Sequence, residues 1–134
     1  MIVVTGFITN ESGMVLLQKR LDPLIINAHD KWESQGGRIE YGESPEEALI
    51  RECREEIGCA VAVKKMLPIV LSRIWKRTDG DEQHVLVLNY ELELLFGEPR
   101  SMDNKVGEVK WFSKNDVEKL DTLAGIKKII ATYL

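Results

Sequence analysis

The chain has 134 residues, of which 44% are hydrophobic and 30% are charged, so it is long enough for a single globular domain. This composition excludes a disordered or collagen-like chain, and no apolar run approaches the roughly 18 residues of a membrane span. The formal net charge of -4 argues against a partner such as duplex nucleic acid, and an N-terminus without a signal-peptide pattern favours a cytoplasmic protein.

The N-terminal part of the chain predicts a hairpin followed by a long loop. The segment Ile2 to Thr9 is rich in β-branched residues, and a turn at 10–13 separates it from a second strand at Met14 to Arg20. The next segment, 21–36, has no hydrophobic periodicity and contains proline and glycine. A loop of this length in a compact domain usually has a function.

The clearest predicted element is a helix from Ser44 to Ile57. Ser44 and Glu47 form the sequence pattern of a capping box, and Pro45 suits the first helical position. Gly58 is a typical stop signal at the other end.

The C-terminal half predicts three further strands and two helices. The extended segment 60–75 contains Pro68, which indicates an edge strand or a bulge. After a turn at 78–81, the segment 84–96 places the side chains of Leu86, Leu88, Tyr90, Leu92 and Leu94 on one face of a strand. A short strand at 109–112 and helices at 114–120 and 123–133 follow. The order of elements predicts an α/β or α+β sandwich.

The predicted helix carries a stripe of three glutamates beside its apolar stripe. Glu52, Glu55 and Glu56 fall within about 100° of the helix circumference. Glu52 and Glu56 are like charges at i and i+4, which destabilise a helix unless something offsets them. Oxygen ligands of this kind suit a hard divalent cation, Mg²⁺ above all, although a solvated acidic face would look the same in the sequence.

The two cysteines do not form a recognisable disulfide or metal-binding pattern. They are Cys53 and Cys59, too few for a disulfide framework and not spaced as C-x-x-C. Cys53 lies among apolar positions of the predicted helix, so we expect it to be a small buried hydrophobic residue.

The spacing around the helix resembles the signature of a known family. The chain contains Gly37-x5-Glu43-x7-Arg51-Glu52-Cys53-x-Glu55-Glu56-x-Gly58-Cys59, which is similar at every fixed position to the Nudix box. The match spans 23 residues, and the order of strands, loop and trailing helices also resembles the Nudix fold. The resemblance implies one Nudix hydrolase domain over residues 1–134, built as an α/β/α sandwich with a mixed sheet.

The resemblance also implies roles for the residues of the box. Glu55 and Glu56 would bind the metal together with the backbone carbonyl near Gly37, and Glu52 would bind metal or act as the general base. Arg51 would orient the glutamates and Glu43 would support the site. Mg²⁺ would be the cofactor, with Mn²⁺ as a substitute, and a small-molecule nucleotide would be hydrolysed at a diphosphate linkage. Because relatives are commonly dimers, a homodimer is an open alternative.

The sequence departs from the family pattern in two places. Relatives often have proline directly before the glycine pair, where this chain has Gln35, and the loss of proline changes the loop or the pocket without removing a ligand. Many relatives also supply a further acidic residue from a distant loop. Glu98, Asp103 and Glu108 are equal candidates for it.

Substrate choice lies outside the box. The patterns of ADP-ribose, diadenosine polyphosphate and NADH hydrolases are missing, so elimination favours a MutT-type nucleoside triphosphate pyrophosphohydrolase. The alternative is a Nudix-like sensor domain that binds a nucleotide without cutting it. Aromatic residues that could stack on a base and basic residues that could meet phosphates are Phe7, Lys19, Arg20, Trp32, Arg38, Tyr41, Arg73, Trp75, Lys76 and Arg77. From this group we select Arg20, Trp32, Arg38 and Tyr41 as the substrate-binding candidates.

Overall fold

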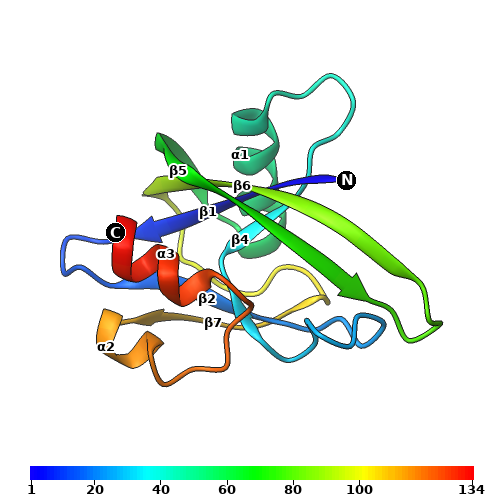
Figure 1. Ribbon diagram of the computed structural model, residues 1–134. Helices are drawn as coiled ribbons and strands as arrows, with labels where there is room; N and C mark the ends of the chain where they lie inside the picture. Colours follow the sequence, from blue (N-terminus) through cyan, green and yellow to red (C-terminus); the bar gives the residue numbers. More distant parts are fainter.

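A mixed seven-stranded sheet lies between helices in the computed structural model, which describes residues 1–134 (Figure 1). The elements in chain order are β1 (Ile2–Thr9), β2 (Val15–Arg20), β3 (Trp32–Glu33), β4 (Gln35–Arg38), α1 (Pro45–Ile57), β5 (Ala60–Lys76), β6 (Glu82–Phe96), β7 (Val106–Phe112), α2 (Lys114–Val117) and α3 (Ile126–Tyr133). None of the helices is long and apolar enough to cross a membrane.

The sheet contains one parallel pair among antiparallel ones. Its main path runs β3-β2-β1-β6-β5, with β4 also beside β1 and β7 beside β2. Strands β1 and β6 run parallel along the full length of β1, from the pair Ile2 and Leu86 to the pair Thr9 and Glu93. All other strand pairs are antiparallel. The predicted α+β sandwich with a mixed sheet is confirmed.

The predicted N-terminal hairpin is correct only at its turn. Strands β1 and β2 pair at Thr9 and Val15 and then separate. The segment 32–38 enters the gap: β3 pairs with β2, and β4 pairs with β1 from Gly6 opposite Gln35 to Val3 opposite Arg38. The prediction of a loop over the whole of 21–36 is therefore wrong at its C-terminal end, because the free edges of the two diverging strands supply backbone partners for this segment.

Helix α1 has the ends that the sequence predicts. The Ser44 hydroxyl accepts a hydrogen bond from the Glu47 N–H, and the Glu47 carboxylate accepts one from the Ser44 N–H. Gly58 closes the helix in the left-handed conformation with φ 71°. These caps fix the first and last turns of the helix that carries the glutamate stripe.

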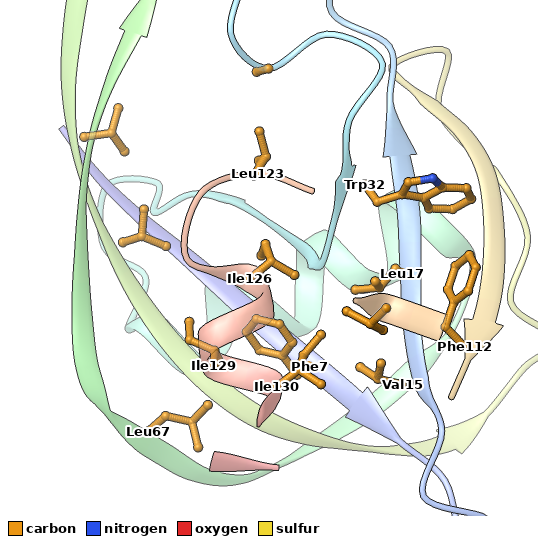
Figure 2. Packing of buried hydrophobic residues seen from close by; sticks show 14 of the residues in the cluster. Phe7, Val15, Leu17, Trp32, Leu67, Phe112, Leu123, Ile126, Ile129 and Ile130 are labelled. Carbon is orange, nitrogen blue, oxygen red and sulfur yellow. The ribbon is translucent and has the colours of Figure 1, made fainter. Parts of the chain in front are cut away.

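The sheet separates two hydrophobic cores. The α1-side core lies under α1, and it consists of Val4, Ile8, Leu16, Ala48, Leu49, Cys53, Ile57, Cys59, Val61, Tyr90 and Leu92. The α3-side core lies on the opposite face, and it consists of Phe7, Val15, Leu17, Ile25, Ala28, Trp32, Leu67, Trp75, Val85, Val87, Phe112, Val117, Leu123, Ile126, Ile129 and Ile130. Figure 2 shows Phe7 of β1 beside Ile129 and Ile130 of α3. Both cysteines are buried and free, which confirms the expectation for Cys53.

Strand β6 follows the predicted alternation with one exception. Tyr90 and Leu92 are buried against α1, and Leu88 and Leu94 pack partly against the same core. Leu86 is 42% exposed, as is its neighbour Ile2 at 51%, because α1 does not cover this end of the sheet.

The later elements agree with the predictions in position but differ in length. Strand β5 lies at the edge of the sheet, and its pairing with β6 is irregular between Met66 and Val70, on either side of Pro68. Both C-terminal helices are shorter than predicted. Helix α3 begins only after Gly125, because Gly125 adopts a left-handed conformation with φ 93° that a helix cannot include.

Candidate active site

A cleft of about 490 Å³ opens where β1 and β2 separate, and it has two ends of different chemistry. We call the first the acidic end: it contains Glu52 and Glu56 of α1 and the glycine pair of β4. We call the second the arginine end: it contains Arg20, Glu33, Arg73 and Trp75. The cleft is therefore lined by one helix together with strands that are far apart in the sequence.

The glycine pair allows the backbone to approach both glutamates. A Cβ on Gly37 would lie 2.6 Å from the Glu52 carboxylate carbon, and one on Gly36 would lie 2.1 Å from the Val4 carbonyl oxygen. The Gly36 N–H donates to Glu56 Oε1 at 2.8 Å. No larger residue fits at either position without moving β1 or the carboxylate.

Arg51 links the other acidic residues at this end. Its guanidinium donates to both carboxylate oxygens of Glu43, at 2.7 and 2.9 Å, and to Glu52 Oε1 at 2.9 Å. It also donates to the Arg38 carbonyl at 3.0 Å, which connects α1 to the end of β4. The hydrogen bonds from Arg51 hold the pKa of Glu43 below its usual value. Arg51 thus fixes the plane of the Glu52 carboxylate beside Gly37.

Glu56 lies deeper in the cleft than Glu52. Burial, and then the charge of Glu33, raise its pKa well above the usual value, whereas the Gly36 N–H acts in the opposite direction. Gln18 Nε2 donates to Glu56 Oε2 at 3.3 Å. Burial also raises the pKa of Glu52. The acidic end therefore concentrates carboxylates whose ionised form is unfavourable unless a cation is nearby.

The arginine end is organised around two guanidinium groups and one aromatic ring. The guanidinium carbons of Arg20 and Arg73 lie 5.0 and 5.7 Å from the centre of the Trp75 ring. Arg20 donates to Glu33 at 3.3 Å and to Asp22 at 3.0 Å, while its buried Nε–H has no partner. Burial raises the pKa of Glu33, and the charge of Arg20 acts against this rise.

Some predicted polar residues lie together and others do not. Of the selected residues, the cleft is lined by Arg20, Gly37, Arg38, Glu52 and Glu56, and Glu43 and Arg51 lie directly behind them. Glu55 does not line the cleft: its carboxylate lies 3.2 Å from Arg51 and its side chain is 55% exposed. Of the three acidic candidates from distant loops, only Asp103 reaches the cleft. No group of three or more potential ligand side chains converges on one point.

The two predicted aromatic contacts lie elsewhere. Trp32 packs edge-on against Phe112 in the α3-side core, as Figure 2 shows. The two ring centres lie 4.9 Å apart. Tyr41 projects fully into solvent from the turn before α1. Neither lines the cleft, and Trp75 of β5 lies there instead. Trp32 is directed away because it alternates with Glu33 along β3, so that only one of the two faces the cleft.

Sequence reasoning missed three polar residues of the site: Gln18 and Gln35, which are fully buried, and Glu33, which is partly buried. Glu33 lies in the segment interpreted as a loop, and Gln18 and Gln35 were not selected at all. Gln18 offered a signal: it is a polar residue two positions after Leu16, so it shares the α1-facing side of β2. A polar side chain at a buried position of a strand usually has a specific partner.

The fold and the cleft define a class of hydrolase. The chain matches the NUDIX domain model over residues 1–133, so it belongs to the Nudix family. It is accordingly a hydrolase of pyrophosphate bonds in nucleoside diphosphate derivatives.

Relatives with different names resemble the chain to similar degrees. An ADP-ribose pyrophosphatase of Methanocaldococcus jannaschii is 29% identical over 99% of the chain and 72% of that protein. An 8-oxo-dGTP diphosphatase of Escherichia coli is 31% identical over 83% of the chain and 78% of that protein. The crystal structure of a MutT NUDIX hydrolase from Burkholderia pseudomallei superposes with a TM-score of 0.75 at 25% identity, covering 96% of this chain and 93% of that one.

Proposed function

We propose that residues 1–134 form a single-domain, Mg²⁺-dependent nucleoside triphosphate pyrophosphohydrolase of the MutT type. The observation that carries the proposal is one cleft with Glu52 and Glu56 beside a glycine pair at one end and Arg20 and Arg73 at the other. A nucleotide needs both a means of neutralising its diphosphate and donors for its remaining anionic or polar groups.

The residues at the acidic end suit a hard divalent cation. Glu52 and Glu56 offer carboxylate oxygens, and the missing side chain of Gly37 leaves its backbone close to them. These three would hold Mg²⁺, with Mn²⁺ as a substitute, and Glu55 stays a predicted ligand. When bound, the ion would screen the diphosphate charge and lower the pKa of a coordinated water.

The protein groups have separate tasks in the proposed reaction. Arg51 and Glu43 keep the Glu52 carboxylate in place, since both are tied to it or to each other by hydrogen bonds. Arg51 occupies Glu52 Oε1, so we assign Oε2 as the atom that would bind the metal or accept a proton from the attacking water. The raised pKa of Glu52 makes it a better base than an ordinary exposed carboxylate.

The arginine end would bind the part of the nucleotide beyond the scissile bond. Arg20 and Arg73 both line the cleft, and their guanidinium groups offer charged donors to anionic or polar groups of a ligand. Both guanidinium groups lie over the ring of Trp75, which helps to hold them in place through cation–π contacts.

The test is a panel of substrates with Mg²⁺, scored by the identity of the products. We expect nucleoside triphosphates to give nucleoside monophosphate and pyrophosphate, and Glu56→Gln to abolish this release. ADP-ribose as the best substrate would replace the MutT-type assignment with the activity named for the archaeal relative. Tight nucleotide binding without turnover of any substrate would instead support the sensor domain.

A further inference from the structure

We propose that Gln35 is a positioning residue of the active site, and that it acts on Glu56 through the side chain of Gln18. Gln35 directly precedes the glycine pair of β4. The inference rests on the proposed function, because its consequence is the orientation of a carboxylate that would hold the metal ion.

Three side chains form a hydrogen-bonded chain inside the protein. Gln35 Nε2 donates to Gln18 Oε1 at 3.2 Å, and Gln18 Nε2 donates to Glu56 Oε2 at 3.3 Å. The other carboxylate oxygen, Glu56 Oε1, accepts from the Gly36 N–H at 2.8 Å. Both glutamines are completely buried, so water does not compete for these bonds. Each oxygen of Glu56 is thus fixed by one donor from a strand.

The direction of this chain follows from what each group can donate. An ionised carboxylate only accepts hydrogen bonds, so Gln18 must turn its NH2 group toward Glu56. Its carbonyl oxygen then faces Gln35, where only a donor is favourable. The opposite orientation of Gln18 would set oxygen against oxygen at Glu56 and nitrogen against nitrogen at Gln35. Glu56 therefore fixes which end of the Gln18 amide faces it, and the NH2 group of Gln35 stabilises that arrangement by satisfying the buried Gln18 oxygen.

The strand geometry explains why these residues meet. Gln18 lies on the α1-facing side of β2, and Gln35 lies opposite Gly6 of β1, on the far side of the gap between the diverging strands. The two amides join across this gap beneath Glu56 of α1. A proline at position 35 has no side-chain donor and would leave the buried Gln18 oxygen unsatisfied, which is unfavourable.

The competing explanation is that Gln35 only fills space beneath α1. A volume-filling role predicts that an apolar residue of similar size serves as well, and that the effect of a change depends on its shape. A hydrogen-bonding role predicts that Gln35→Met and Gln35→Leu have the same effect on Glu56, whatever their packing. It also predicts that the effect disappears once Gln18 has lost its amide.

The experiment measures the dissociation constant of Mn²⁺ by titration calorimetry of the metal-free protein, without substrate. We expect Gln35→Met, Gln35→Leu and Gln18→Met each to weaken Mn²⁺ binding by about 10-fold or more. This is the lower limit of the loss in affinity that is usual when a hydrogen-bond partner of a metal ligand is changed. The double variant Gln18→Met/Gln35→Met should bind Mn²⁺ no more weakly than Gln18→Met alone. The turnover number of each single variant should fall while KM for the nucleotide stays close to wild type.

The matched control is Asn89→Leu, which removes another buried side-chain amide. Asn89 donates to the carbonyls of Ile69 and Val87 and accepts from the Thr5 hydroxyl, and none of these is a hydrogen-bond partner of Glu56. This variant should therefore lower the melting temperature and leave Mn²⁺ affinity intact. Wild-type affinity in Gln35→Met, additive effects in the double variant, or a loss only in Gln35→Leu would each overturn the inference while leaving the proposed function standing. A wild-type protein that does not bind Mn²⁺ would overturn both.

Discussion

The two ends of the cleft are built in different ways. At the acidic end, Arg51, Glu52 and Glu56 come from two turns of one capped helix, and the glycine pair that meets them is a short distance upstream. At the arginine end, Arg20, Glu33 and Arg73 come from three different strands. The comparison shows that the acidic end, where we propose the reaction takes place, is formed by residues close together in the sequence. The arginine end, which would bind the rest of the substrate, depends instead on how distant strands pair.

This difference separates the expected effects of substitutions. Changes at the acidic end should alter ion binding and turnover, because the carboxylates and their partners lie where the diphosphate is cut. Changes at Arg20, Arg73 and Trp75 of the arginine end should alter substrate affinity and preference while leaving ion binding intact, whereas Glu33 also acts on Glu56 through its charge. The following variants would sharpen this separation or break it.

The largest effect is expected for Glu56→Gln at the acidic end. Loss of this carboxylate removes several kcal/mol of stabilisation of the transition state, so kcat should fall by about 1,000-fold or more in a pyrophosphate-release assay. Without metal, two effects on stability oppose each other: the lost charge is favourable, because burial and Glu33 disfavour the ionised carboxylate, whereas the new NH2 group faces a donor at Gly36 or Gln18. The rise in melting temperature on adding Mn²⁺ should shrink, and full activity in this variant would remove the acidic end from the chemistry.

A smaller loss is expected for Arg51→Lys. Lysine keeps the charge but lacks the planar fork that bonds both oxygens of Glu43 and also reaches Glu52. We expect kcat/KM to fall by about 10–100-fold, as for other partners of metal ligands, with most of the change in kcat. Steady-state kinetics at saturating Mg²⁺ check this, and a change confined to KM would contradict the orienting role.

A moderate effect, on KM rather than on kcat, is expected for Trp75→Leu at the arginine end. The ring supports two guanidinium groups, and each such contact contributes about 0.5–2 kcal/mol. KM for the nucleotide should therefore rise by about 10-fold, while Mn²⁺ affinity stays at the wild-type value. A weaker Mn²⁺ affinity would show that the two ends are not independent.

The smallest effect is expected for Tyr41→Ser. This side chain is fully exposed on the turn before α1 and makes no contact with the cleft. Stability should change by less than about 0.5 kcal/mol, and kcat/KM should stay within about twofold of wild type. A large rise in KM would mean that the turn folds over the bound substrate, and it would restore the sequence-based choice of Tyr41.

The departures from the sequence-based predictions have a common origin. Met14 to Arg20 was correctly predicted as a strand, but its partners were not, since β2 leaves β1 after one residue pair and bonds to β3 and β7. The same divergence orders the end of the predicted loop. Trp32 and Trp75 are both candidates for stacking in the sequence, and both are 8% exposed in the α3-side core, but only Trp75 also lines the cleft, which the pairing of the strands decides.

The sequence by itself determined α1, its capping box, its left-handed glycine stop, and the arrangement of Arg51, Glu52 and Glu56 along it. These features depend on neighbours within a few residues, so helical geometry relates them without knowledge of the rest of the chain. Tertiary structure alone decided the arginine end, the burial of Gln18 beside Gln35, and the exposure of Tyr41. Strand pairing joins segments far apart in the chain, and a shift of one residue along a strand turns a side chain from one face of the sheet to the other.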